Sequence, residues 1–160
     1  MREILFRGKR IDNGEWAEGY FVHCKSDFDE ESERTAEIIS NNADRIYKGE
    51  YSPFDVCEAI LETVGQFIGV TDRNGKKIFE GDLLNGFQYP FYRSESAEHN
   101  YFAEVIWFTE NCAFGLYTHK HPTAKVRGIS AGNADFIEDF NSDDWEVIGN
   151  IYDNPELLEG

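Results

Sequence analysis

The stretch that decides the fold is Leu5-Phe-Arg-Gly-Lys-Arg-Ile-Asp-Asn-Gly-Glu-Trp-Ala-Glu-Gly-Tyr-Phe-Val22. Asn13-Gly14 at its centre is the preferred pair for a type I′ turn, because both residues tolerate positive φ. The stretch therefore predicts a β-hairpin, with opposite charges and aromatic rings facing one another across the strands. The predicted pairs are Ile11–Trp16, Lys9–Glu18, Arg7–Tyr20 and Leu5–Val22 on one face, and Arg10–Ala17, Gly8–Gly19 and Phe6–Phe21 on the other.

A second hairpin is predicted within Thr63–Asp82, where the turn again contains Asn-Gly, at Asn74-Gly75. The side chain of Asp72 is placed to cap this loop. The register is open by one residue, since a loop of about four or five residues with Gly75 in the left-handed conformation fits equally well.

Further strands are predicted where short apolar runs lie between turn signals. These runs are 82–87, 101–108, 113–118 and 145–151, with Thr109–Cys112 as the turn between the two middle runs. Asn154-Pro155-Glu156 indicates the N-cap and first turn of a short C-terminal helix that continues through Leu158. Short strands at regular spacing favour a mainly β fold, a small antiparallel β-barrel or roll.

Two segments leave their structure open. Residues 27–52 hold an acidic run, then Ile38-Ile39, then a polar loop, which fits one strand within a long excursion. Residues 54–64 follow Ser52-Pro53, a fair helix start, and their apolar residues share one helical face. Because the neighbouring segments are all β, a strand fits nearly as well. The predicted fold therefore carries an irregular or partly helical insertion.

The composition describes an acidic, aromatic-rich and folded protein. A chain of 160 residues is long enough for one domain with a real core. Its formal net charge of −16 argues against binding to duplex DNA, which requires positive charge to displace counterions. The 13 Phe, 8 Tyr and 3 Trp exceed what a disordered acidic chain carries.

The sequence predicts a cytoplasmic protein. The chain opens without a long apolar segment that would serve as a secretory signal, and no run approaches the ~18 apolar residues of a membrane helix. The three cysteines, Cys24, Cys57 and Cys112, are scattered and odd in number. That pattern is typical of reduced thiols rather than of a disulfide framework.

Three blocks of the sequence resemble the YopX family of phage and prophage proteins. The first is Arg2-Glu-Ile-Leu-Phe-Arg-Gly-Lys-Arg-Ile-Asp-Asn-Gly-Glu-Trp16. The second is Glu62-Thr-Val-Gly-Gln-Phe-Ile-Gly-Val-Thr-Asp-Arg-Asn-Gly-Lys-Lys-Ile-Phe-Glu-Gly-Asp82, which is similar to the central signature of that family. The third is Trp145-Glu-Val-Ile-Gly-Asn-Ile-Tyr-Asp-Asn-Pro-Glu-Leu-Leu158, which resembles its C-terminal signature.

The resemblance implies a single YopX-like domain over residues 1–160, with an SH3-like roll. The signature blocks then cover 2–22, 62–83 and 145–158, and residues 23–61 and 84–144 are variable insertions. It also implies a protein encoded by a phage or prophage and located in the cytoplasm of a bacterial host. The family has no assigned activity, so the resemblance transfers no catalytic residue, and neither a cofactor nor a metal is expected.

Two groups of residues invite an enzymatic hypothesis. His119 and His121 fall on one face of an extended segment and, with Cys112 or Asp135, suggest a zinc site. The pair lacks a matched second pair of ligands, so a solvated loop beside Pro122 is the favoured interpretation. His23-Cys24 suggests a thiolate and its base, but adjacent strand residues point to opposite faces.

Aromatic side chains on a small barrel suggest a second hypothesis, the binding of single-stranded nucleic acid. Such sites normally lie in a basic groove. The basic residues here gather only modestly, at Arg2, Arg7, Lys9 and Arg10 and again at Lys120, Lys125 and Arg127.

The acidic residues, by contrast, are concentrated in two runs. Residues 27–37 carry −5 and residues 135–146 carry −6, so two short runs hold most of the net charge. The simplest role of the two acidic runs is to keep the protein soluble. The alternative is an acidic surface that docks on a basic host protein, as a mimic of nucleic acid. The predicted docking residues are Asp27, Asp29, Glu30, Glu31, Glu33, Asp135, Glu138, Asp139, Asp143 and Asp144.

These observations favour a non-enzymatic phage or prophage accessory protein that binds other proteins. The predicted partners are a second copy of the chain, a host or phage protein, or both. Self-association follows from the edge strands and surplus aromatic residues, which need covering. Binding to a membrane or to duplex DNA is not expected.

Overall fold

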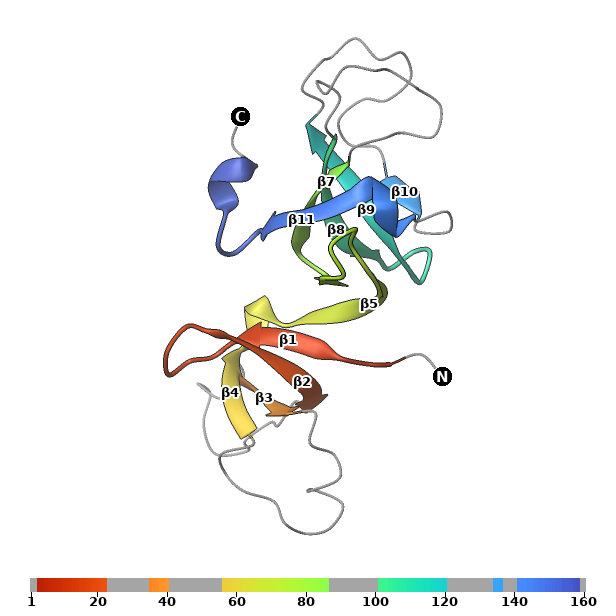
Figure 1. The fold of residues 1–160 in the computed structure, drawn as a ribbon. Helices are drawn as coiled ribbons and strands as arrows, with labels where there is room; N and C mark the ends of the chain where they lie inside the picture. The colour runs from red at the N-terminus through yellow and green to blue at the C-terminus, as the bar shows by residue number, and fades with distance from the viewer. Residues whose placement is uncertain are drawn as a thin grey trace. The chain divides into compact units, whose positions relative to one another are not determined.

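The computed structural model describes residues 3–22, 35–40, 56–86, 101–120, 134–136 and 141–158. The chain divides into two compact units, unit 1 at residues 1–67 and unit 2 at residues 68–160, and each is described by itself. Both are built from antiparallel strands, so the mainly β prediction is confirmed (Figure 1).

Unit 1 contains four strands in the order β4-β3-β2-β1. Their bounds are β1 Phe6–Lys9, β2 Trp16–Val22, β3 Thr35–Ser40 and β4 Val56–Ile60. The start of β5 (Gly65–Thr71) pairs with β1, after a 3₁₀ turn at Leu61–Thr63. Arg10, at the end of β1, forms an antiparallel bridge with Ala59 of β4, so the sheet curls back on itself.

The first hairpin is confirmed, but its predicted register is wrong by two residues. Arg7 lies opposite Glu18 and Lys9 opposite Trp16, and the Arg10 N–H donates to the Glu15 carbonyl at 2.9 Å. The loop is therefore Ile11–Gly14, in which Gly14 has a φ of +73° and the Gly14 N–H donates to the Arg10 carbonyl. A shift of two residues preserves the faces of both strands, because side chains alternate with period 2.

The interior face of unit 1 is lined by small residues. Gly8 and Gly19 are buried and Ala59 is fully buried. Phe6 and Phe21, predicted as a direct pair, contact one another diagonally, with ring centroids 5.4 Å apart. Small side chains let the strands approach closely, which suits a strongly curled sheet.

Residues 54–64, for which the sequence left helix and strand open, contain a strand that pairs with another strand. Residues 56–60 form β4, which pairs with β3 from Thr35↔Ile60 to Ile39↔Val56. Strand β3 contains Ile38 and Ile39, so the single strand predicted within 27–52 is confirmed. The remaining residues of both segments lie outside those that the structure describes, apart from the 3₁₀ turn Leu61–Thr63 and Val64, which follow β4.

Unit 2 contains the end of β5, then β6 Lys77–Phe79, and a five-stranded sheet in the order β10-β9-β8-β7-β11. The strands of this sheet are β7 Asp82–Gly86, β8 Tyr101–Phe108, β9 Ala113–Lys120, β10 Ala134–Phe136 and β11 Trp145–Asn150. The strands predicted at 82–87, 101–108, 113–118 and 145–151 are thus confirmed, with small differences at their ends. The two ranges that were predicted to be variable insertions, 23–61 and 84–144, contain β3, β4, β8, β9 and β10 and thus contribute strands to both sheets.

The barrel alternative of the predicted barrel or roll is not confirmed, because within the described ranges neither sheet has the strand order of a closed barrel. The SH3-like detail of the fold is not confirmed. The predicted C-terminal helix is a single 3₁₀ turn, Pro155–Leu157. Asn154 does not cap it through its side chain; instead, the Asn154 Oδ1 accepts from the Asn150 N–H at 3.4 Å.

The second hairpin is confirmed together with its cap. The Asp72 N–H donates to the Lys76 carbonyl at 2.8 Å, and Gly75 has a φ of +80°, in the left-handed region. The Asp72 Oδ1 accepts from the N–H groups of Asn74 and Lys76, at 2.8 and 2.9 Å. Five residues, 72–76, separate β5 from β6, which agrees with the predicted loop length.

Asp72 also binds β11 through its second oxygen. The Asp72 Oδ2 accepts from the Val147 N–H at 3.0 Å, and the Arg73 N–H donates to the Trp145 carbonyl at 3.0 Å. Only 3% of Asp72 is exposed. Burial opposes the charge of this carboxylate, but three backbone N–H groups outweigh it, and the pKa of Asp72 is lowered. The carboxylate of Asp72 thus binds both its own turn and β11.

The core of unit 2 is a cluster of large aliphatic residues from several strands. Ile78, Leu84 and Val105 are completely buried in it. The other buried members are Ile68, Ala103, Leu116 and Val147, with Val70, Phe114 and Trp145 packed against them. This cluster is the main hydrophobic core among the described residues.

Candidate interaction face

Strand β2 exposes apolar side chains on its outer face. Tyr20 and Val22 are two residues apart, so they share a face, and they are 41% and 39% exposed. Phe21, between them, points to the other side and contacts Phe6. A strand in a small sheet can carry apolar side chains on both of its faces. Only one of these two faces is then buried within the unit to which the strand belongs.

Strand β4 and the hairpin loop extend this apolar surface. Ile60, at the end of β4, is 37% exposed, and Ile11 of the loop is 46% exposed. The Ile11 N–H donates to the Glu58 carbonyl at 3.0 Å, which attaches the loop to β4. Glu58 is exposed and lies between Val56 and Ile60 on the same face of the strand.

Strand β3 connects these residues in register. Ile39 pairs with Tyr20 on one side and with Val56 on the other. Glu37 pairs with Val22 on one side and with Glu58 on the other. We call this set of positions the outer face of unit 1: Ile11, Tyr20, Val22, Glu37, Ile39, Val56, Glu58 and Ile60.

The outer face holds most of the exposed large apolar side chains of the described residues. Four of them belong to it, and the others are Ile4, which precedes β1, and Trp107 on β8. Scattered apolar residues on a surface need no explanation, but several exposed apolar residues grouped in one small sheet are typical of a binding site.

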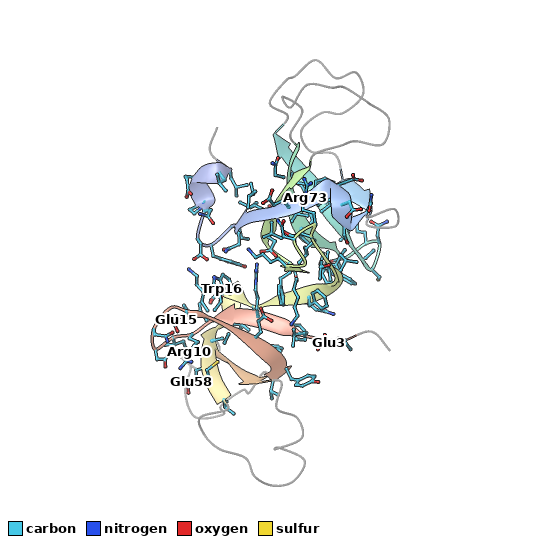
Figure 2. All side chains as sticks on the ribbon, viewed as in Figure 1. Glu3, Arg10, Glu15, Trp16, Glu58 and Arg73 are labelled. Atoms are coloured by element: carbon cyan, nitrogen blue, oxygen red, sulfur yellow. The ribbon has the colours of Figure 1, made fainter. Side chains whose placement is uncertain are left out.

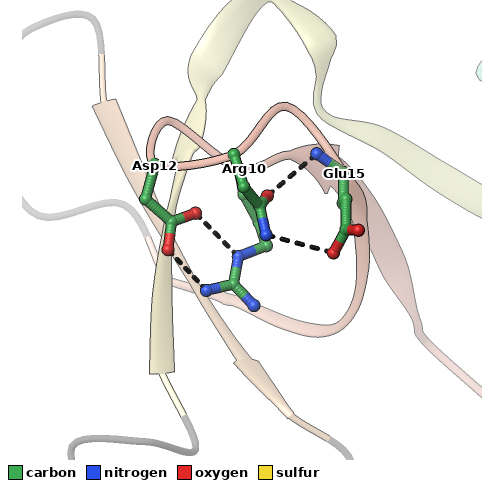
Figure 3. A network of polar contacts seen from close by, with 4 residues as sticks. Arg10, Asp12 and Glu15 are labelled. Carbon is green, nitrogen blue, oxygen red and sulfur yellow. Dashed lines mark hydrogen bonds and ion pairs between the residues drawn. The ribbon is translucent and has the colours of Figure 1, made fainter.

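The hairpin tip beside this face is fixed by its own polar contacts (Figure 3). The Arg10 guanidinium donates to both carboxylate oxygens of Asp12, at 2.9 and 2.6 Å. This bidentate pair raises the pKa of Arg10 and lowers the pKa of Asp12. The Asn13 Oδ1 accepts from the Glu15 N–H at 2.9 Å, and the Asn13 Nδ2 donates to the Glu15 Oε2 at 3.0 Å. The charges at the tip are thus engaged with one another.

Trp16 is in contact with the basic residues of β1. The Arg7 guanidinium carbon lies 4.6 Å from the Trp16 ring centroid, and the Lys9 Nζ lies 5.7 Å from it. Arg7 is itself buried. Figure 2 shows Trp16, Arg10 and Glu15 on the first hairpin, with Glu58 on β4. Because the cations of β1 stack on the indole, this cluster is already an internal cation–π contact.

The sequence profile of the YopX protein family matches residues 5–159 of the chain. The chain belongs to the YopX family. The resemblance carried by the three signature blocks is therefore confirmed. A search of curated protein sequences found no match. Among solved structures, the crystal structure of protein EF1440 from Enterococcus faecalis is similar at 20% identity, covering 99% of each chain, with a TM-score of 0.47.

Most of the acidic docking residues predicted for this YopX-family chain fall outside the described residues: Asp27, Asp29, Glu30, Glu31, Glu33, Glu138 and Asp139. Asp135 lies in β10. Asp143 and Asp144 lie in a 3₁₀ turn, where the side chain of Asn141 accepts from the Asp143 N–H at 3.3 Å and donates to the Asp144 Oδ2 at 3.1 Å. The docking role of the two acidic runs stays a prediction.

The residues of the enzymatic hypothesis are only partly described. His119 lies in β9 and Cys112 in the turn before it, whereas His23, Cys24 and His121 lie outside the described residues. Within the described ranges, no group of three His, Cys, Asp or Glu residues could hold a metal ion. Cys57 is half-buried on β4, and burial raises the pKa of its thiol.

No helix in the described part of the chain is long and apolar enough to cross a membrane. The outer face itself was missed by the sequence analysis, because it depends on the pairing of β2 with β3 and of β3 with β4. A signal was present in Tyr20-Phe21-Val22, a run within the predicted hairpin that is apolar on both faces.

Proposed function

We propose that this YopX-family protein is a non-enzymatic phage or prophage accessory protein that acts by binding another protein through the outer face of unit 1. The observation that carries the proposal is the group of exposed apolar side chains that the first hairpin and β4 contribute, Ile11, Tyr20, Val22 and Ile60. Contiguous exposed apolar surface marks interaction sites in soluble proteins.

Aromatic anchors supply much of the energy in protein interfaces, so Tyr20 is the residue on which we expect binding to depend most. Its ring contributes a large contact area at a low cost in conformational entropy. Val22 and Ile60 extend the apolar area on either side of the paired β3 positions.

Two buried polar residues have structural roles, which supports the proposal that the protein is not an enzyme. The buried carboxylate of Asp72 accepts three backbone hydrogen bonds. The buried side chain of Asn150 accepts from the N–H groups of Tyr152 and Asp153, at 3.0 and 2.9 Å. Both therefore fix turns, which is a sufficient reason for their burial.

The contacts of the first hairpin make it a poor candidate for nucleic-acid binding. Arg10 is paired with Asp12, and Arg7 is buried against Trp16. A phosphate would have to compete with these contacts, and a base would have to displace the cations from the indole.

Affinity capture tests the proposal. The tagged full chain and its Tyr20→Thr variant are incubated with lysate of phage-infected bacteria, and bound proteins are identified by mass spectrometry. We expect a protein that is retained by the natural chain and reduced at least about tenfold by the variant. The matched control is Ile4→Thr, which removes an exposed apolar side chain outside the outer face. Equal retention by all three chains would overturn the proposal.

A further inference from the structure

The two hairpin loops each contain an Asn-Gly pair, Asn13-Gly14 in unit 1 and Asn74-Gly75 in unit 2. Asparagine is among the chemically labile residues of proteins. It reacts most readily before glycine, because glycine has no Cβ to hinder the approach of its backbone nitrogen to the asparagine side chain. Both asparagines are exposed, and both glycines have a positive φ. The chain therefore presents the same reactive pair in two similar turns.

The attacking nitrogen is held equally in the two turns. The Gly14 N–H donates to the Arg10 carbonyl at 3.0 Å, and the Gly75 N–H donates to the Asp72 carbonyl at 2.9 Å. One backbone hydrogen bond must break at either site before the nitrogen can react. A difference in reactivity between the two sites therefore depends on the asparagine side chains.

The two side-chain amides are held differently. The Asn13 Oδ1 accepts from the Glu15 N–H at 2.9 Å, and the Asn13 Nδ2 donates to the Glu15 Oε2 at 3.0 Å. Among the described residues, the side-chain amide of Asn74 makes a single hydrogen bond, from its Nδ2 to the Glu146 Oε1 at 3.3 Å. The Asn74 amide is thus the less restrained of the two, and it turns toward the Gly75 nitrogen at a lower cost in free energy.

We propose that Asn74 is a site of spontaneous deamidation in the folded protein and that Asn13 is protected from the same reaction. The Gly75 nitrogen attacks the Asn74 Cγ and closes a succinimide ring, while the Cγ–Nδ2 bond breaks and the proton of the Gly75 amide leaves with the ammonia. Water then opens the ring. Hydrolysis at Cγ gives aspartate, and hydrolysis at the main-chain carbonyl gives isoaspartate, in which the backbone continues through the side chain.

Either product weakens the contacts of the turn at 72–76. A carboxylate at position 74 no longer donates to Glu146 and places a second negative charge beside it. Isoaspartate adds a backbone atom between the N–H groups of Asn74 and Lys76, which both donate to the Asp72 Oδ1, at 2.8 and 2.9 Å. The lengthened loop does not keep both contacts, so deamidation loosens the turn that binds β11.

The reaction is measured on the full chain, incubated in mildly alkaline buffer and analysed by peptide mapping with mass spectrometry. We expect Asn74 to react about 2–10 times faster than Asn13, the factor that one additional hydrogen bond contributes. Equal rates, or a faster reaction at Asn13, would overturn the proposal. It would also be overturned by an Asn74 that stays intact while the urea-denatured chain reacts.

Denatured chains separate the effect of the fold from that of the sequence. The turn contacts are absent in urea, and glycine follows both asparagines, so we expect similar rates at Asn13 and Asn74. A preference for Asn74 that persists unchanged in urea would come from the neighbouring residues along the chain, and the protection assigned to Glu15 would then be wrong.

Glu15→Ala tests this protection directly. The variant removes the carboxylate that holds the Asn13 Nδ2, so we expect Asn13 to react about 2–10 times faster than in the natural chain and Asn74 to react as before. The matched variant Glu146→Ala removes the longer contact of Asn74 and is expected to raise the rate at Asn74 by a smaller factor. Unchanged rates at Asn13 in Glu15→Ala would show that its side-chain contacts do not protect it.

The effect of the product on the turn is measured by hydrogen exchange. The Val147 N–H donates to the Asp72 Oδ2 at 3.0 Å, so it reports on the contact between the turn and β11. We expect this N–H to exchange faster in the deamidated fraction than in the unreacted chain. Equal exchange in the two fractions would show that deamidation leaves the turn in place.

Discussion

The two units differ in how many of their large apolar side chains they bury. Unit 2 buries Ile78, Leu84 and Val105 completely in one aliphatic cluster. Unit 1 lines its curled sheet with small residues, such as Gly8, Gly19 and Ala59, and leaves Tyr20 and other large side chains exposed. The comparison indicates that apolar burial is the main source of stability in unit 2, whereas unit 1 leaves exposed the apolar side chains on which the proposed binding depends.

The largest expected effect comes from the core of unit 2. Leu84→Ala removes a completely buried side chain, and we expect it to lower the free energy of unfolding by about 2–5 kcal/mol. Denaturation in urea measures this value, with Ile4→Thr as the exposed control. A loss below about 1 kcal/mol would mean that the aliphatic cluster is not the main source of stability in unit 2.

The second prediction concerns the turn that binds β11. Asp72→Asn replaces one carboxylate oxygen by an amide, so one of the three backbone contacts is lost, and we expect a loss of about 1–3 kcal/mol at neutral pH.

The pH dependence of that loss gives an independent check. Because the pKa of Asp72 is lowered in the folded protein, the carboxylate stabilises the fold above its ordinary pKa of about 4, and this stabilisation disappears as the pH falls through the lowered value. The difference between the natural chain and Asp72→Asn should therefore shrink below about pH 4. A difference that is constant from neutral to acidic pH would exclude the charge as its cause.

A smaller effect is expected at the aromatic contact of unit 1. Phe21→Leu keeps an apolar side chain but removes the ring that lies 5.4 Å from Phe6, and we expect a loss of about 0.5–1.5 kcal/mol. The double variant with Phe6→Leu isolates the coupling between the two rings. Strict additivity of the two single losses would show that the rings do not stabilise one another.

The smallest expected effect on stability is at the outer face. Tyr20→Thr replaces an exposed residue by one that also favours strands, so we expect the free energy of unfolding to change by less than about 0.5 kcal/mol. The same variant should have the largest effect on capture of a partner. If Tyr20→Thr lowered the free energy of unfolding as much as Leu84→Ala does, the contrast between exposed apolar side chains in unit 1 and buried ones in unit 2 would be contradicted.

Local turn chemistry made much of the fold predictable from the sequence. The second hairpin was predicted with its left-handed Gly75 and with the cap by Asp72, because both features depend on residues within the turn. The first hairpin was predicted with its faces but not with its register. Asn13 does not adopt the left-handed conformation there, because its side chain binds Glu15 and the loop is attached to β4 through Ile11.

The features that were not predictable depend on pairing between distant segments. Residues 56–60 have an apolar pattern that also fits a helix, and only their register with β3 makes them a strand. The C-terminal segment has the sequence of a capped helix, yet the Asn154 Oδ1 accepts from the Asn150 N–H and not from a backbone N–H of the turn that follows. The candidate site was missed for the same reason, since Tyr20 on β2 and Ile60 on β4 are joined only through the pairing of both strands with β3.

The contact between Asp72 and β11 also bears on how the protein avoids aggregation. Strand β11 is the last in its sheet, and such a strand offers its unpaired N–H and C=O groups to any other extended chain. The turn at 72–76 occupies two of these groups, the Val147 N–H and the Trp145 carbonyl, with a side chain and a backbone amide rather than with a further strand. A charged side chain thereby blocks the sheet against extension by a neighbouring molecule.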